Sequence, residues 1–311
     1  MANSTLLSLF QTTLQGMGVS TYGLPATVIS NTNQDVVQTL ALVNAGGDEI
    51  AREHDWQALW KQNIFTAVAY SYTATTLNGS TTLSALSSTT GISANPTYFS
   101  VTGQYIANDC NLVSVDTGTS TAVLSQAATG SGTGQTITFS QTKFPFPADY
   151  DRQIDRTHWD KSKRWEMLGP ETPQQAEWLR SSYISTGPRV RYFLQGGYFQ
   201  IWPALGSDEL LVYDYLSKNW IYATGGTATT KQAFTADTDT TIFPDALMRA
   251  LIRLKYLEAK GLDTTAAYRV YSQQLDLAKA HDAGSPTLAM APTPSTVLIT
   301  SAQIPDSGYG T

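Results

Sequence analysis

The sequence is poor in charge and in cysteine. Only 14% of its 311 residues are charged, against about 25% in ordinary soluble domains. Low charge beside seven Trp and sixteen Tyr residues is typical of surfaces that contact other proteins, although a surface rich in Ser and Thr explains it equally well. The single cysteine, Cys110, excludes a disulfide within the chain. We expect it to be a small, half-buried strand residue.

Long apolar runs and a positive net charge are also missing. No apolar run reaches the length of about eighteen residues that crosses a bilayer, and residues 1–20 lack the basic start of a signal peptide. We therefore expect a chain kept in a cytoplasm or on a soluble particle. The formal net charge of −6 argues against a protein that grips nucleic acid. The negative charge is still compatible with a protein that lines a channel for DNA, because an acidic wall repels phosphate and lets DNA slide.

Motifs for catalysis and ligand binding are absent as well. His54, His158 and His281 each lie near a carboxylate in sequence, yet we expect polar residues at helix ends or on the surface rather than general bases. Residues 236–240 begin like a calcium loop but lack its later Gly and Glu. We expect Asp239, or a neighbouring Thr, to cap the next helix instead. The sequence thus predicts no enzyme, no cofactor and no metal site.

Helical patterns occupy both sides of the chain. Apolar spacing and capping residues predict helices over 4–15, with Ser4 as cap, and over 33–54, 244–260 and 264–281. Gly46-Gly47 interrupts the second helix, where we expect a kink or a boundary between two helices.

Aromatic residues follow two of these segments. We expect Trp56, Leu59 and Trp60 to pack against the core. Asp149 to Arg156 is expected to be a helical turn or short helix. A further helix should start at Thr172-Pro173 and bury Trp178, Leu179 and Tyr183.

The stretch 66–142 has a different composition. Asp109 and Asp116 are its only charged residues between 66 and 142, and short alternating segments are separated by Gly, Asn, Pro and Asp. This pattern predicts an inserted β-sandwich or barrel. Further along, Gly196-Gly197 between two apolar runs predicts a β-hairpin, and residues 209–216 predict a third strand.

These patterns predict an α+β protein in four segments. A helical bundle with a small antiparallel β-sheet comprises 1–65 and 143–284, an all-β module is inserted at 66–142, and an extended tail covers 285–311. The tail contains four prolines and one charged residue, Asp306. It is either disordered or laid on a partner, because no compact core can form from it. Its apolar residues fit a docking peptide: Leu298, Ile299, Ile304 and Tyr309.

A series of segments in fixed order carries a family resemblance. The segments are NQDVVQTLALVNAGGDEIAREHDWQAL, FPFPADYDRQIDRTHWD, RWEMLGPETPQQAEWL, YFQIWP, LVYDYLSKNW and FTADTDTTIFPDALMRALIRLKYLEAKGLD. In this order they resemble the head-to-tail adaptors of short-tailed bacteriophages, which are related to tail tubular proteins. The resemblance covers about 28–65 and 144–283, whereas 66–142 is similar only in composition to β modules inserted into phage virion proteins.

The resemblance implies a structural role in the virion. Family members form a ring, typically of twelve copies, below the portal protein, and contact tail nozzle or tail fibre proteins while DNA passes without sequence recognition. It also implies that 285–311 is the arm that docks on the portal, and that assembly takes place in the host cytoplasm. We expect the free chain to be monomeric and the tail to order on binding.

Two other functions stay open. A tail-associated cell-wall hydrolase would need a carboxylate pair, for which Glu166 and Glu171 are candidates. A receptor-binding or fibre-binding module would place recognition of a sugar or a fibre on the insertion at 66–142.

Overall fold

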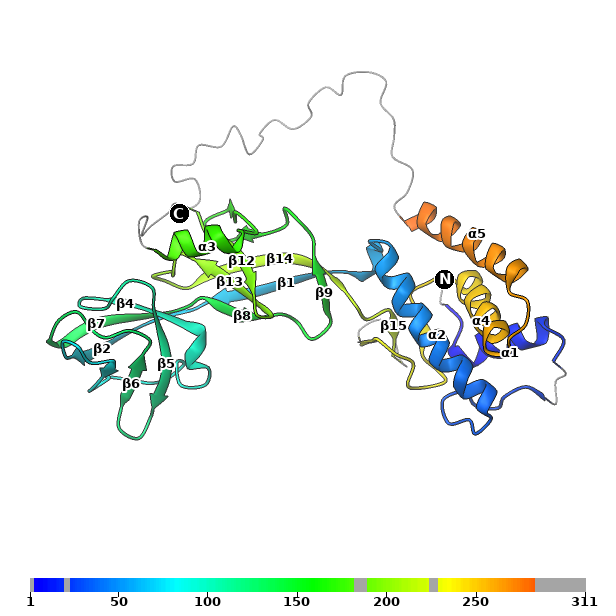
Figure 1. Ribbon diagram of the computed structural model, residues 1–311, viewed down its shortest axis with the longest axis horizontal. Helices are drawn as coiled ribbons and strands as arrows, with labels where there is room; N and C mark the ends of the chain where they lie inside the picture. Colours follow the sequence, from blue (N-terminus) through cyan, green and yellow to red (C-terminus); the bar gives the residue numbers. More distant parts are fainter. Residues whose placement is uncertain (1–2, 20–22, 182–188, 224–228, 283–311) are drawn as a thin grey trace, which may run out of the picture. The chain divides into compact units, whose positions relative to one another are not determined.

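The computed structural model describes residues 3–19, 23–181, 189–223 and 229–282. It contains helices and antiparallel sheets, which confirms the mixed α+β class (Figure 1). The chain divides into two compact units. Within the described residues, unit 1 comprises 3–61, 149–153 and 215–282, and unit 2 comprises 62–148 and 154–214, with the gaps given above. Among the described residues, no helix is both long and apolar enough to cross a bilayer.

Unit 1 is built around one central helix. Its helices are Leu6–Gly16 (α1), Gln34–Glu53 (α2), Asp245–Ala259 (α4) and Thr265–Asp282 (α5). Helix α4 contacts α1, α2 and α5, and its buried side chains include Leu247, Leu251 and Leu254. A small sheet in the order β16-β15-β17 completes the unit. Its strands are Ile221–Tyr222 (β15), Thr230–Lys231 (β16) and Thr240–Thr241 (β17).

The caps of the first two helices explain where they begin. Thr5, not Ser4, caps α1, and its hydroxyl accepts the backbone N–H of Ser8. The expectation for Ser4 is wrong because its hydroxyl donates to Asp245 at 2.5 Å. Asn33 caps α2 by accepting the N–H of Asp35 at 2.9 Å.

Gly46 and Gly47 do not interrupt α2, which is one continuous helix. The expected boundary between two helices is therefore wrong. A Cβ on Gly47 would lie 2.1 Å from a ring carbon of Trp220, and one on Gly46 would lie 2.8 Å from Leu251. Both glycines are present because neighbouring side chains occupy the space where a Cβ would be.

The stretch 66–142 forms a nearly closed, barrel-like sheet in unit 2. The strands follow the order β2-β7-β4-β5-β6-β3. An isolated bridge between Thr75 and Ser84, with backbone hydrogen bonds of 2.8 and 3.1 Å, joins β2 to the residue after β3. The strands are Ala69–Thr76 (β2), Thr82–Leu83 (β3), Phe99–Gly103 (β4), Cys110–Asp116 (β5), Thr121–Leu124 (β6) and Gly132–Gln141 (β7).

The barrel has Greek-key connections and neighbouring ends. Strands β4, β5 and β6 follow one another, and β7 returns to lie beside β4. Ala69 at the start of β2 pairs with Ser140 near the end of β7, so the module is entered and left at adjacent points. The interior is filled by apolar side chains including Phe99, Phe139 and Cys110. Cys110 is fully buried rather than half-buried.

The predicted hairpin at Gly196-Gly197 is confirmed. Arg191–Gln195 (β12) pairs with Tyr198–Trp202 (β13), and a third strand, Lys143–Pro145 (β8), pairs with β13. Both glycines have positive φ, 61° and 80°, which a two-residue loop of this kind requires. The hairpin is thus hydrogen-bonded, through β13, to the strand that follows the barrel.

The remaining strands surround β14. A sheet in the order β1-β14-β10-β11 forms, and β9 pairs with the end of β14. The bounds are Trp60–Ala67 (β1), Tyr150–Gln153 (β9), Trp159–Asp160 (β10), Trp165–Glu166 (β11) and Glu209–Ser217 (β14). The helical turn expected over 149–156 is wrong, because backbone pairing with 215–217 makes residues 150–153 a strand.

Burial of the tryptophans is mixed. Trp56 and Leu59 are buried, but Trp60 is 53% exposed, so its expected place in the core is wrong. The helix predicted at Thr172-Pro173 is confirmed as Pro173–Arg180 (α3), with a capping box formed by Thr172 and Gln175. Leu179 is buried as expected, whereas Trp178 is 49% exposed, and Tyr183 lies outside the described residues.

Candidate functional site

The tail residues predicted to dock on a partner are not among those the structure describes. Leu298, Ile299, Ile304 and Tyr309 all lie after residue 282. Their role therefore stays a prediction, and the candidate surfaces come from α5 and from unit 2.

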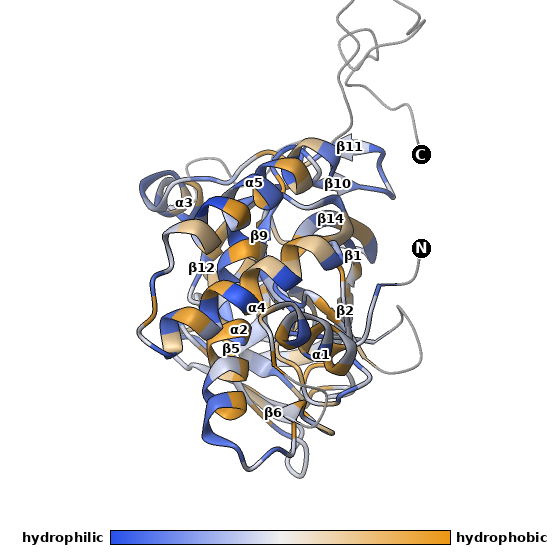
Figure 2. Ribbon diagram, turned by 90° about the vertical axis from the view of Figure 1, so that its right-hand side faces the viewer, coloured by the Kyte–Doolittle hydropathy of each residue, from blue (hydrophilic) through white to orange (hydrophobic). Residues whose placement is uncertain are grey.

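Helix α5 has an exposed apolar row on the side away from its buried residues. Ala267, Leu275 and Ala278 are buried, while an opposite row is exposed: Ala266, Val270, Gln273, Leu277 and Ala280. The row advances by four, three, four and three residues, which is the spacing of a coiled-coil seam. Figure 2 shows hydrophobic segments recurring along this helix. The row is suited to packing against another helix.

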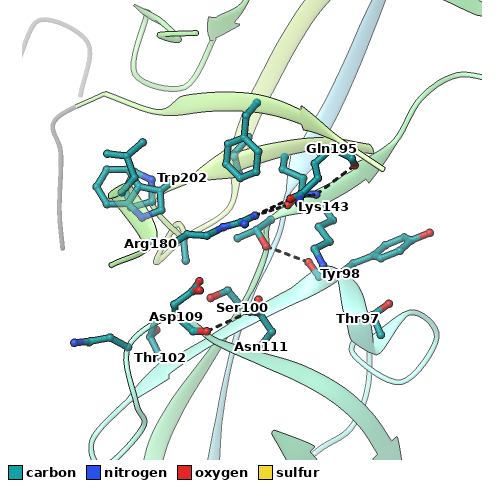
Figure 3. A pocket seen from close by; sticks show the side chains of 18 of the residues that line it. Thr97, Tyr98, Ser100, Thr102, Asp109, Asn111, Lys143, Arg180, Gln195 and Trp202 are labelled. Carbon is teal, nitrogen blue, oxygen red and sulfur yellow. Dashed lines mark hydrogen bonds between the residues drawn. The ribbon is translucent and has the colours of Figure 1, made fainter. Parts of the chain in front are cut away.

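A pocket of about 740 Å³ lies in unit 2 between the barrel and the β12–β13 hairpin (Figure 3). Its volume falls in the range of about 300–1,000 Å³ that is common for small-molecule sites. Direct hydrogen bonds hold its two walls together. The N–H of Ile201 donates to the carbonyl of Thr142 at 3.0 Å, and the buried Ser140 hydroxyl donates to the carbonyl of Leu205 at 2.5 Å.

One wall of the pocket carries a guanidinium held by its neighbours. The Arg180 nitrogens donate to Glu177 at 2.7 Å and to the side-chain oxygens of Gln195 and Gln200 at 3.1 Å each. The Arg180 carbon Cζ lies 4.8 Å from the centre of the Phe193 ring, a distance that allows a cation–π contact. These contacts fix the direction of the side chain (Figure 3).

The opposite wall comes from the barrel and carries a carboxylate. Asp109 has φ +53°, a backbone conformation that Asp and Asn adopt more readily than most residues. Burial raises the pKa of the Asp109 carboxyl, and the charges of Arg180 and Lys143 oppose that rise. Asn111 donates to the backbone carbonyl of Asp109 at 3.2 Å. Positive and negative groups thus face one another across the pocket.

The histidine expectations are met at two positions and wrong at the third. His54 ends α2 and lies 3.3 Å from Asp282, and His281 is exposed in the last turn of α5. His158 is not a surface residue. It is 1% exposed, and its ring stacks on Tyr192 with centroids 4.0 Å apart. Burial lowers the pKa of His158 to about 4.

Residues 236–240 organise a turn rather than cap a helix. Asp239 is fully buried and accepts the backbone N–H groups of Thr235 and Ala236 at 2.9 Å each. Lys231 donates to its carboxylate at 3.0 Å. The expected cap is therefore wrong, and α4 begins after Pro244 without a side-chain cap.

The carboxylates proposed for hydrolysis have separate surroundings. Glu171 forms an ion pair with Arg191 at 2.5 Å, and Glu166 lies in β11. A different carboxyl pair is buried in unit 2. Glu209 bonds to Asp160, and both residues are buried. Burial, the hydrogen bond to Asp160 and the Asp160 charge raise the pKa of Glu209 to about 7, while Lys163 opposes this.

Replacing Glu209 by Gln should stabilise the protein in alkaline solution. The raised pKa means that the fold binds a proton more tightly than the unfolded chain between pH 4.5 and 7, so charging Glu209 costs stability as the pH rises. An amide mimics the protonated form and can donate to Asp160. We expect the free energy of unfolding of Glu209→Gln, measured in urea, to exceed that of wild type by about 2–3 kcal/mol at pH 8.

At pH 4.5 most of this advantage should disappear, since wild-type Glu209 is then protonated in the fold and about half protonated in the unfolded chain. Glu166→Gln, which removes a half-buried carboxylate from β11 of the same unit, serves as the matched control. A Glu209→Gln variant with no greater advantage at pH 8 than at pH 4.5 would contradict the assignment.

The sequence analysis predicted neither the pocket nor the exposed row of α5. The pocket draws on segments around 98–111, 142–143, 179–180 and 193–204, and no motif links them. The spacing of 266–280 could have revealed the α5 row, but only packing shows which face of that helix is buried.

Among the described residues, no group of three His, Cys, Asp or Glu side chains is placed to hold a metal ion. Comparison with models of known families finds no match, and comparison with curated proteins also finds none.

Proposed function

We propose that the chain is a structural virion protein, a ring-forming head-to-tail adaptor that binds the portal and extends the DNA channel. The exposed row on α5 is the observation that carries the proposal. Its seam-like spacing and apolar character fit a helix that packs against a neighbouring chain. The ordered segment series and the low, acidic charge of the sequence support the same role.

The row also suggests how neighbours are kept in register. Val270 and Leu277 are 39% and 50% exposed and flank Gln273. Burying a polar residue within an otherwise apolar seam penalises slipped alignments, because its amide must find a partner. A ring needs this specificity, since each copy must contact its neighbours in the same way.

In this role the protein acts mechanically. Contacts are spread over interfaces, and no few residues dominate as they would in an active site. Residues 285–311, with Leu298, Ile299, Ile304 and Tyr309, form the proposed portal-docking arm. Nozzle or fibre proteins are the proposed partners on the tail side, and an acidic channel wall lets DNA slide without sequence recognition.

Charges placed in the α5 row should prevent ring assembly. In the double variant Val270→Glu/Leu277→Glu, two carboxylates would have to be buried in the seam, so we expect at least about a hundredfold weaker assembly on the portal. Negative-stain imaging and light scattering of the protein mixed with its portal measure this. The monomer should stay folded, because both positions are exposed.

Leu77→Glu is the matched control, since Leu77 is 62% exposed and follows β2 in unit 2, whereas α5 belongs to unit 1. It should form rings like wild type. A variant ending at residue 284 tests the arm separately: it should lose portal binding. Normal rings from the α5 double variant would overturn the role of the row, and an intact chain that binds no portal would overturn the adaptor itself.

A further inference from the structure

The pocket of unit 2 has no part in the proposed ring and has the chemistry of a binding site. Its walls are joined by β8–β13 pairing and by hydrogen bonds that bridge the barrel and the strands that follow it. One of these links is the Asp208 carboxylate, which accepts the N–H of Ala69 at 2.9 Å. A preformed pocket of this kind loses little entropy when it binds a ligand.

The charges of the walls nearly balance. Arg180 and Lys143 lie on one side and Asp109 on the other. Arg180 already pairs with Glu177, and Lys143 and Asp109 carry opposite charges, so the lining has little net charge with which to hold an anion or a cation. A purely apolar molecule would leave these polar groups desolvated without partners, which costs free energy. The pocket therefore favours a neutral ligand with many hydrogen-bonding groups.

The lining supplies donors and acceptors together. Ser100 and Thr102 present hydroxyls from β4, and Asn111 presents an amide from β5. A sugar hydroxyl both donates and accepts, so it can bond to a carboxylate on one side and to an amide or guanidinium on the other.

Aromatic rings lie at both ends of the pocket. Trp202 is half-buried at the end of β13, and the rings of Tyr98 and Tyr198 lie 5.4 Å apart at the other end. Ring faces of this kind pack against the apolar C–H faces of a pyranose, while the polar edges of the sugar bond to neighbouring groups.

We infer that this pocket binds a short neutral oligosaccharide, with Trp202 as the stacking surface and Asp109 as a hydrogen-bond acceptor for sugar hydroxyls. The site gives the particle a means of contacting a glycan that is independent of ring assembly. Lys143 and Arg180 stay on the opposite wall, where they donate to ligand oxygens and offset the Asp109 charge.

The test uses the full chain and three neutral probes, maltotriose, mannotriose and chitotriose, in saturation-transfer NMR and calorimetry. Fully deacetylated chitotriose is the cationic match, and trigalacturonic acid is the anionic one. At least one neutral trimer should bind, and its affinity should change little between low and high salt, because no net charge is paired. Neither charged trimer should bind more tightly.

Variants locate the site. Trp202→Ala should weaken binding about tenfold or more, while Trp178→Ala, an exposed tryptophan of the same unit outside the pocket, should leave it unchanged. Asp109→Asn keeps the shape and tolerates the positive φ, so it stays folded even if Trp202→Ala does not. It should lower the affinity for a neutral ligand about tenfold, whereas it would raise the affinity for an anion.

Three results would overturn the inference. They are no transfer to any neutral trimer, binding that survives both pocket variants, and tighter binding of a charged trimer. None of these bears on the adaptor role, which the portal experiment tests separately.

Discussion

Gly47→Val is expected to leave unit 1 without a stable fold, and Gly47→Ala to destabilise it by about 3 kcal/mol. The Cβ of either variant would overlap the benzo ring of Trp220, 2.1 Å away. Trp220 cannot move aside freely. It is fully buried, stacks on Phe243 at 5.7 Å, and donates through its indole N–H to Asp48 at 2.9 Å.

The ring and the glycine can be tested as a pair. Gly16→Ala is the helical control, since nothing lies within 4 Å of its Cβ, and it should be neutral or stabilising by up to about 1 kcal/mol. Trp220→Phe removes the overlapping ring, so Gly47→Ala should cost less in that background than in wild type. Helical circular dichroism during urea unfolding measures the stability of wild type and of each variant. Equal costs in both backgrounds would contradict the packing argument.

The second large effect is a loss of stability in acid that comes from His158. Its ring is buried among Tyr192, Phe199 and Tyr213, and burial lowers its pKa from 6.5 to about 4. Between these values the unfolded chain binds a proton that the fold does not, so acidification favours unfolding. Fully developed near pH 4, the loss should be about 3 kcal/mol.

His158→Phe keeps an aromatic ring in the stack and removes the titration. As the pH falls from 7 to 4.5, the free energy of unfolding of this variant, measured in urea, should rise by about 2–3 kcal/mol relative to that of wild type. His281→Phe, at an exposed position, should show no such gain. The same shift in both variants would mean that burial of His158 is not the cause.

His158 and Glu209 act in opposite directions over the same pH range. As the pH falls from 7 to 4.5, the fold loses stability through the histidine and regains it through the carboxyl pair. The free energy of unfolding of wild type should therefore depend only weakly on pH through these two groups. In His158→Phe it should rise as the pH falls, and in Glu209→Gln it should fall as the pH falls. The double variant should return toward the flat response.

Local patterns predicted the elements of this fold more successfully than their burial. Alternation over 66–142 predicted β structure, and two glycines predicted the β12–β13 turn, because turn chemistry and strand period are local. Trp60 and Trp178 were placed in the core, yet both are largely exposed. Burial depends on which faces of the helices and strands pack together, and the spacing of residues along the chain does not determine that.

The errors at glycine and aspartate have a related cause. Gly46-Gly47 resembles a helix break until Trp220, far away in sequence, is seen to occupy the space. Asp239 resembles a cap until its bonds to Thr235, Ala236 and Lys231 appear. The pocket shares this property, since its walls come from segments about a hundred residues apart in the chain. Residue type determines which interactions a side chain can form. Contacts with residues far away in sequence determine which of these interactions it does form.

The pairing of Ala69 with Ser140 has an evolutionary consequence. A module whose first and last strands are neighbours can be spliced into, or out of, a host loop without stretching the flanking chain. Homologous chains can therefore exchange this barrel for another domain by recombination at the two ends of the insertion, because the residues at those ends lie side by side in the fold. Lineages that share the surrounding framework should therefore differ most sharply in residues 66–142.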